Sequence, residues 1–288
     1  MSVLEAHHLS KGFGGVQAVQ DVSLAVDAGE MLALIGPNGA GKSTTFNMLG
    51  GQLRPDGSEV WIRGKPATGL RPGKLWRLGV GRTFQITATF ASMTVRENVQ
   101  MAPLSASRAM SRFWRPRFWR SATRLHRAEA DALLERVGLL DQAERAAGVL
   151  AYGDLKRLEL ALALAHDPAL LLMDEPTAGM APAERGALMA LTRRLATERA
   201  LAVLFTEHDM DVVFAVADRV IVLDRGRVIA QGRPDVIRAD VRVQQVYLGV
   251  PPTASVPARA DAARSAVGAA AGATAPAAAP QAPPGTAA

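Results

Sequence analysis

Apolar and polar positions follow two different patterns in the first part of the chain. Residues 3–9 alternate and predict a strand, and residues 17–26 predict a second strand paired with it. A turn over Asp27 to Glu30 ends the second strand. Residues 31–35 are apolar throughout and are followed at once by glycines, which is typical of a buried parallel strand. We therefore expect paired strands first and a buried parallel sheet next.

Similar patterns continue to about residue 248. Further strands are predicted at 58–62, 80–85, 170–173, 201–206, 219–223 and 227–230, and helices at 43–49, 129–137, 155–165, 182–195 and 210–217. Strands that alternate with helices predict a parallel sheet flanked by helices. From about 87 to 165 the character is mostly helical, with Leu133, Leu134 and Val137 on one helix face. This stretch is predicted to be a helical insertion within an α/β core.

The end of the chain differs in composition from the rest. Residues 250–288 consist mainly of Ala, Pro and Gly. They offer too few large apolar side chains to offset the entropy lost on ordering. We predict one folded domain over residues 1–249 and a disordered tail over 250–288.

Composition narrows the class of protein. The 288 residues are 49% hydrophobic and 21% charged, which is ordinary for a soluble globular protein. The absence of cysteine excludes disulfides and thiolate metal sites. The net charge of +6 fits nucleic acid, an anionic membrane surface or a bound polyphosphate as a partner. No signal peptide and no strongly apolar run long enough to span a bilayer is recognised, so we expect a soluble chain with peripheral membrane contact at most.

A glycine-rich loop lies between the strand at 31–35 and the helix at 43–49, and it matches the whole phosphate-loop pattern. Glycines let successive backbone N–H groups point at one anion, and the following helix adds its positive N-terminal end. Lys42 would supply a charge to the β- and γ-phosphates, and Ser43 a hydroxyl to Mg²⁺. The predicted nucleotide-binding residues of this loop are Gly36, Pro37, Asn38, Gly39, Ala40, Gly41, Lys42, Ser43 and Thr44.

A second candidate element is the apolar strand at 170–173, which leads directly into Asp174 and Glu175. Asp174 can hold Mg²⁺ through water, and Glu175 is placed to polarise an attacking water molecule. Strands that end in acidic residues are common. The prediction therefore depends on the combination of this strand with the phosphate loop.

In this order the motifs resemble the nucleotide-binding subunits of ATP-binding cassette (ABC) transporters, over about residues 3–249. The resemblance implies an α/β fold in which a P-loop NTPase core with a parallel sheet carries an antiparallel β subdomain and a helical insertion. It implies an ATPase that uses ATP and Mg²⁺. It also implies that two such subunits meet head to tail, with each ATP between the phosphate loop of one and the signature of the other.

The resemblance assigns roles to single residues as well. Phe13 matches the aromatic residue that stacks on adenine, and Gln85 matches the glutamine that touches Mg²⁺ and senses the membrane partner. Gly153 lies in the signature and offers its N–H to the phosphate of the opposite subunit, and His208 matches the switch histidine that contacts the γ-phosphate. Catalysis is then expected to depend on Lys42, Glu175 and His208, and metal binding on Ser43, Gln85 and Asp174.

The signature of this chain, Leu-Ala-Tyr-Gly-Asp at 150–154, departs from the usual Leu-Ser-Gly-Gly-Gln. Ala151 cannot donate the hydrogen bond that the family's serine makes to the γ-phosphate. Asp154 adds negative charge near a helix start, which favours the helix but repels nucleotide. Ala181 replaces an acidic or amide residue in the loop that signals between the two sites. We expect slower or asymmetric hydrolysis and a second, different ATPase subunit as partner, which makes a heterodimer.

Together with the segments 81–85, 93–99, 175–179 and 246–249, this signature resembles that of one of the two motors of branched-chain amino acid importers. The resemblance implies transmembrane permease subunits as direct partners and a periplasmic solute-binding protein as an indirect one. It implies no nucleic-acid partner. The expected location is peripheral, at the cytoplasmic face of the inner membrane.

Other functions remain open at this point. They are a motor for urea or amides, a motor for lipopolysaccharide export, and a soluble ABC ATPase that acts on nucleic acid or ribosomes. The last class usually carries two cassettes or a long coiled-coil insertion, and this sequence shows neither. The basic and aromatic stretch from Arg112 to Arg120 would suit a lipid headgroup boundary, or a solvated loop whose aromatic residues pack on its own helices.

Overall fold

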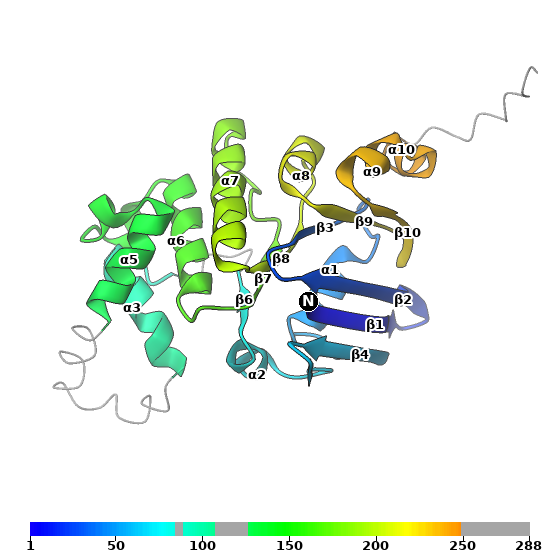
Figure 1. The fold of residues 1–288 in the computed structure, drawn as a ribbon, viewed down its shortest axis with the longest axis horizontal. Helices are drawn as coiled ribbons and strands as arrows, with labels where there is room; N and C mark the ends of the chain where they lie inside the picture. Colours follow the sequence, from blue (N-terminus) through cyan, green and yellow to red (C-terminus); the bar gives the residue numbers. More distant parts are fainter. Residues whose placement is uncertain (84–88, 107–125, 249–288) are drawn as a thin grey trace, which may run out of the picture. The chain divides into compact units, whose positions relative to one another are not determined.

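The computed structural model describes residues 1–83, 89–106 and 126–248. Within these residues, six strands form a central sheet in the order β10-β9-β3-β8-β7-β6 (Figure 1). Neighbouring strands are parallel except for β9 and β10, which are antiparallel. The strands are β3 (Met31–Ile35), β6 (Val80–Arg82), β7 (Leu170–Asp174), β8 (Ala202–Thr206), β9 (Arg219–Asp224) and β10 (Arg227–Gly232). The predicted parallel sheet is confirmed, with one antiparallel strand added at its edge.

A second sheet is antiparallel and has the strand order β2-β1-β4-β5. Its strands are β1 (Ser2–Phe13), β2 (Val16–Asp27), β4 (Gly57–Ile62) and β5 (Lys65–Pro66). The first three match predicted strands. The sequence did not predict β5, because two residues carry no recognisable alternation.

The central sheet is buried on both faces, which explains its uninterrupted apolar strands. All five side chains of β3 are buried, and they alternate between two apolar clusters. Met31, Ala33 and Ile35 pack on the side of the larger helices, whereas Leu32 and Leu34 pack towards the antiparallel sheet and helix α1 (Lys42–Leu49). A strand covered on both faces has no polar side, so its sequence shows an apolar run and not an alternation.

The helical insertion is present as predicted. It contains α3 (Val95–Ala106), α5 (Arg127–Val137), α6 (Tyr152–Leu164) and short 3-10 helices at Leu140–Gln142 and Ala147–Val149. Leu133, Leu134 and Val137 are buried, as their spacing predicts. Further helices are α7 (Pro182–Arg199) and α8 (Met210–Val216), with α2 (Pro72–Arg77), α9 (Pro234–Ala239) and α10 (Val241–Leu248). In the described ranges no helix is both long and apolar enough to cross a bilayer.

The structure corrects two predicted boundaries and adds three helices. The strand predicted for residues 80–85 ends at Arg82, and helix α7 continues beyond Leu195 to Arg199. The sequence analysis missed α2 and α9, whose six residues each barely complete a hydrophobic repeat, and it also missed α10. The predicted roles of Gln85, of the segment Arg112 to Arg120 and of the tail concern residues outside the described ranges.

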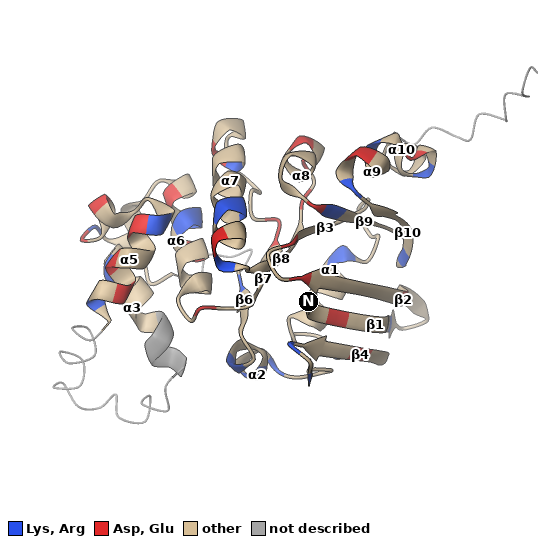
Figure 2. Ribbon diagram, viewed as in Figure 1, with Lys and Arg blue, Asp and Glu red and all other residues tan. Residues whose placement is uncertain are grey.

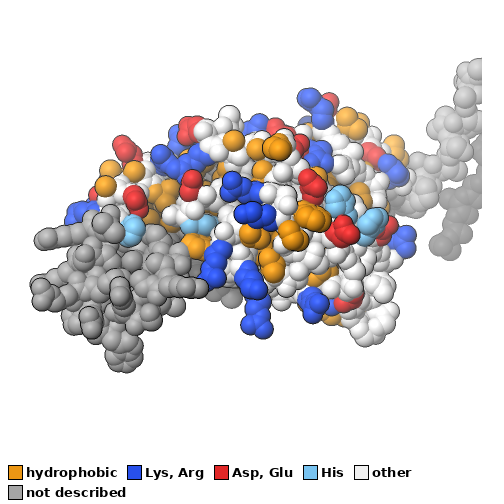
Figure 3. All heavy atoms as spheres, turned by 60° about the horizontal axis from the view of Figure 1, so that its bottom comes forward, with side chains coloured by type: hydrophobic (Ala, Val, Ile, Leu, Met, Phe, Trp, Pro, Cys, Tyr) orange, Lys and Arg blue, Asp and Glu red, His pale blue; other side chains and the backbone are white. Residues whose placement is uncertain are grey.

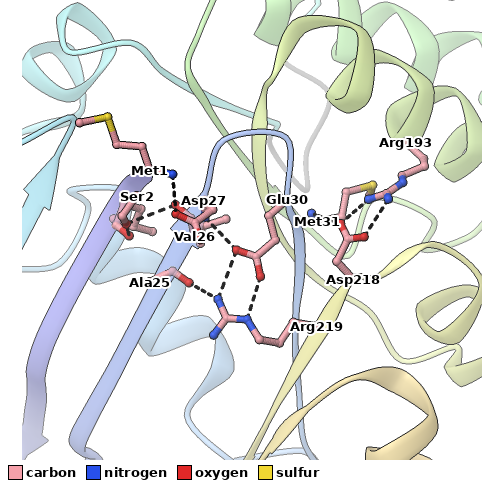
Figure 4. A network of polar contacts seen from close by, with 11 residues as sticks. Met1, Ser2, Ala25, Val26, Asp27, Glu30, Met31, Arg193, Asp218 and Arg219 are labelled. Atoms are coloured by element: carbon pink, nitrogen blue, oxygen red, sulfur yellow. Dashed lines mark hydrogen bonds and ion pairs between the residues drawn. The ribbon is translucent and has the colours of Figure 1, made fainter.

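Polar contacts join the two sheets where β2 leads into β3 (Figure 4). The Arg219 guanidinium donates to both carboxylate oxygens of Glu30, at 2.7 and 3.2 Å, and to the Ala25 carbonyl. Asp218 accepts a hydrogen bond from the backbone N–H of Met31 at 2.9 Å and pairs with Arg193 of helix α7. Burial acts to raise the pKa of Asp218, but the hydrogen bonds from Arg193 and Met31 outweigh it and lower the pKa.

Replacing Asp218 with Asn should lower the free energy of unfolding by about 1–2 kcal/mol at neutral pH, because charge-assisted hydrogen bonds to Arg193 and Met31 weaken. The pKa of Asp218 is lower in the folded state, so its contribution is present above the ordinary carboxyl range and is lost under acid. The difference in the free energy of unfolding between wild type and variant should therefore decrease as the pH falls. Urea unfolding at several pH values measures this, and exposed Asp141→Asn serves as the control.

Candidate functional site

The glycine-rich loop leaves the C-terminal end of β3 and leads into helix α1. Gly36 has a φ of +154°, and a Cβ there would lie 2.2 Å from the Leu223 carbonyl oxygen of β9. Gly41 has a φ of +99°, and a Cβ there would lie 2.5 Å from the Ala18 carbonyl oxygen of β2. Any side chain at either position would collide with backbone. The loop is therefore held between β9 and β2 in a shape that only glycine permits.

Lys42 is the buried cation of this loop, with 7% of its surface exposed. Its ammonium group donates hydrogen bonds to the loop carbonyls of Gly36, at 2.6 Å, and Pro37, at 3.1 Å. Burial lowers the pKa of Lys42, and the nearby charges of Glu175 and Asp174 act against this shift. The cation thus lies inside the loop and close to the acidic end of β7. Ser43, next in the chain, is exposed at the start of α1.

The two acidic residues lie at the C-terminal end of β7, beside β8. Asp174 is in register with Thr206, whose hydroxyl donates to the Asp174 carboxylate at 2.8 Å. The backbone N–H of Glu175 donates to the Thr206 hydroxyl at 3.0 Å. Glu175 has a φ of +49°, which is uncommon for a residue other than glycine. The chain therefore turns sharply at Glu175, directly after the buried strand.

His208 follows β8 and lies against Glu175. The distance from its Nε2 to the Glu175 carboxylate oxygen is 2.7 Å. Half of the His208 side chain is exposed, against 24% of Glu175. Because a carboxylate can only accept, the imidazole Nε2–H donates in this pair. Two residues more than thirty positions apart thus meet at one edge of the sheet, as neighbouring parallel strands predict.

A layer of polar residues behind this pair was missed by the sequence analysis. Buried Glu207 accepts a hydrogen bond from the backbone N–H of Thr177 at 2.9 Å, and burial raises the pKa of its carboxyl group. Asp209 accepts from the first backbone N–H groups of α8 and pairs with Arg185 at 3.0 Å. The polar run directly after β8 was the available signal, but its partners lie elsewhere in the sequence.

The signature segment begins helix α6 and contacts the loop that follows Glu175. The Tyr152 hydroxyl donates to the Ala178 carbonyl at 3.0 Å. Gly153 lies beside Glu184, since a Cβ built on Gly153 would be 3.0 Å from the Glu184 carboxylate oxygen. Asp154 accepts from Gln142 at 2.8 Å. Tyr152, which departs from the usual glycine, thus links the signature to Ala178 and Gly179 within one chain.

Phe13 lies at the end of β1, with 49% of its surface exposed and the Lys11 ammonium 5.7 Å from the ring centre. The neighbouring strand β2 passes the phosphate loop at Ala18. A half-exposed ring is available for stacking, and the adenine contact of Phe13 stays a prediction. The role of Gln85 also stays a prediction, because this residue lies outside the described ranges.

Replacing Tyr152 with Phe should loosen the loop after Glu175, because only the hydroxyl is removed and the ring remains. Loss of one such hydrogen bond should speed amide hydrogen exchange at residues 177–181 roughly two- to tenfold. Exchange measured by mass spectrometry on the full chain tests this. Thr197→Val is the matched control, because it removes a hydroxyl-to-carbonyl bond of 3.1 Å from α7. Unchanged exchange in the Tyr152 variant would contradict the link.

Comparison with known families gives two matches. Residues 19–178 match the ABC transporter family, and residues 227–252 match the family described as branched-chain amino acid ATP-binding cassette transporter.

Among curated proteins, the chain is 40% identical over 250 residues to the high-affinity branched-chain amino acid transport ATP-binding protein BraF of Pseudomonas aeruginosa, covering 86% of this chain and 98% of that protein. It is 39% identical over 256 residues to the high-affinity branched-chain amino acid transport ATP-binding protein LivG of Escherichia coli K12, covering 86% of this chain and 98% of that protein.

Solved structures agree with this relationship. The ADP conformation of an ATP-binding cassette of an ABC transporter has a TM-score of 0.76 at 30% identity, covering 87% of this chain and 100% of that chain. A nucleotide-free cassette from an ABC transporter has a TM-score of 0.74 at 31% identity, covering 86% and 99%.

Proposed function

Because the chain belongs to the ATP-binding proteins of the ABC transporter family, we propose that it is the ATP-hydrolysing motor of a branched-chain amino acid importer. The observation that carries the proposal is the position of the phosphate loop next to Asp174, Glu175 and His208. A buried cation, two carboxylates and an imidazole at one sheet edge can bind a polyphosphate and activate water.

The proposed roles follow from the chemistry of each side chain. The Lys42 ammonium exchanges its loop carbonyls for the β- and γ-phosphate oxygens, and the loop amides bind the same phosphates. Glu175 accepts a hydrogen bond from the attacking water and orients it, and His208 contacts the γ-phosphate. Phe13 stacks on adenine, Gln85 touches the metal ion and Gly153 binds the phosphate of the opposite subunit.

Mg²⁺ is the cofactor that the residues would fit. The exposed Ser43 hydroxyl and the Asp174 carboxylate are the available oxygen ligands. Among described residues, no cluster of three His, Cys, Asp or Glu could hold a metal by itself. That agrees with an ion that takes most of its ligands from nucleotide and water. When bound, Mg²⁺ would neutralise charge on the phosphates.

The solute class is supported by the segment at residues 227–252, which matches the branched-chain amino acid family, and by the names of the relatives. The proposed partners are two permease subunits at the cytoplasmic face of the inner membrane, with a periplasmic solute-binding protein acting through them. A second, different ATPase subunit is proposed because Ala151 lacks the hydroxyl that the usual signature offers to the opposite nucleotide.

An uptake assay tests the proposal. The full chain, its partner ATPase and the two permeases are placed in membrane vesicles with the solute-binding protein and ATP. Labelled leucine should accumulate, and unlabelled isoleucine or valine should compete. Uptake of urea in place of leucine would contradict the solute class, whereas absence of ATP hydrolysis would contradict the motor function itself.

A further inference from the structure

Unpaired basic side chains are concentrated around α2 and the β4–β5 turn. Residues 54–77 contain six Lys or Arg but only two acidic residues. All six are exposed, and none makes a side-chain hydrogen bond or ion pair with the part of the chain that the structure describes. We call these six residues the basic surface: Arg54, Arg63, Lys65, Arg71, Lys74 and Arg77.

Packing contacts bring the ends of this stretch towards α2. A Cβ built on Gly69 would lie 3.4 Å from the Arg54 side chain, so Arg54 packs beside Gly69. Arg71 is two residues after Gly69 in the chain. Gly79 lies just after the end of α2, and a Cβ built on it would be 3.9 Å from the Arg63 guanidinium. Figure 2 shows basic positions on α2 and the segments next to it, and Figure 3 shows Lys and Arg side chains gathered on this face.

The nearby acidic residues do not neutralise this surface. Asp56 pairs with Lys11 at 2.5 Å, at the start of β4. Glu59 of β4 is the second acidic residue of this stretch, and its one negative charge offsets only one of the six positive charges. In the described parts of the chain outside this stretch, most arginines have an acidic or amide partner, as Arg193 has with Asp218 and Arg219 with Glu30. The concentration of free positive charge is therefore local and does not merely reflect the net charge of the chain.

The geometry of the charges indicates the kind of partner. The six side chains belong to separate segments, which are the loops before β4 and before α2, the β4–β5 turn, strand β5 and helix α2. Such a spread cannot enclose a single small anion, but it can lie against a broad anionic surface. Trp61 of β4 is 37% exposed beside β5, and tryptophan is favoured at the level of lipid headgroups.

We propose that the basic surface rests on anionic lipid headgroups of the membrane that holds the permease partners. The attraction needs no lipid pocket, because each long side chain can reach a headgroup separately. This inference goes beyond the proposed ATPase function. It requires neither hydrolysis nor a partner subunit, so its failure would be distinguishable from failure of the proposed function.

Vesicle co-sedimentation of the full chain tests the proposal. Vesicles of phosphatidylcholine alone are compared with vesicles that also contain phosphatidylglycerol. The test variant combines Lys74→Gln with Arg77→Gln. The control combines Arg136→Gln with Arg194→Gln, which removes the same charge from exposed positions on α5 and α7. Circular dichroism confirms that both variants are folded.

Wild type should bind only the anionic vesicles, and salt should weaken the binding. The test variant should bind them roughly 30-fold more weakly, whereas the control should stay close to wild type. If both variants lost vesicle binding equally, the binding would depend on net charge alone, and the proposal would be overturned. Absence of wild-type binding would overturn it too. The proposal would also be overturned if the test variant bound vesicles normally but no longer assembled with the permeases. The same holds if it bound vesicles normally but no longer bound nucleic acid.

Discussion

Glu175→Gln should lower the rate of ATP hydrolysis roughly 10²- to 10⁴-fold while leaving ATP binding largely intact. Gln keeps the size of the side chain and one carbonyl oxygen, but it loses the charge that accepts a proton or orients water. Its amide can still hydrogen-bond to His208, so the edge of the sheet should keep its shape. The affinity for ATP should change little, because Glu175 is proposed to act on water and not on the phosphates.

Steady-state phosphate release and equilibrium binding of a fluorescent ATP analogue separate the two effects. Glu198→Gln provides a matched control, since Glu198 lies on the exposed face of α7 with 56% of its side chain accessible. Near-normal turnover in the Glu175 variant would remove the role assigned to this carboxylate. Loss of binding together with turnover would instead mean that Glu175 maintains the shape of the site.

Lys42→Met should weaken ATP binding roughly 10- to 100-fold, because one charge-assisted contact to phosphate is lost in a buried position. Met fills much of the same space, so the loop should keep its fold even though Gly36 and Pro37 lose a donor. Without the cation, Asp174 and Glu175 would also face the phosphates uncompensated. Hydrolysis should therefore fall further than the affinity alone explains.

Isothermal titration with ATP and with ADP measures this loss, and Lys65→Met gives an exposed lysine as reference. The loss should be larger for ATP than for ADP, since Lys42 is assigned to both the β- and the γ-phosphate. Equal affinities of wild type and variant for ATP would contradict the assignment.

The central fold was predictable because its strands are buried on both sides. Residues 31–35 and 170–173 show uninterrupted apolar runs, and each is followed at once by a chemical motif. Such apolar runs can be recognised in the sequence without knowing which segments contact one another in the folded protein. Helices α2 and α9 were missed, because their six residues are placed mainly by packing against neighbouring elements.

The site was predictable for a related reason. Parallel strands end at the same edge of a sheet, so motifs after β3, β7 and β8 had to meet there. Contacts between distant segments were not predictable. The bond from Tyr152 to Ala178 and the bond from Thr177 to Glu207 depend on the path of loops, about which no residue pattern is informative.

The pairing of β3 also determines when the site can form during synthesis. Residues 31–35 hydrogen-bond only to β8 and β9 within the described sheet, and those strands end at Thr206 and Asp224. A nascent chain therefore carries its nucleotide-binding loop on an unpaired strand until almost the whole domain has left the ribosome. Contacts of such long sequence separation are slow to form. Translation pauses or truncations before about residue 224 should leave this apolar strand exposed to aggregation or chaperones.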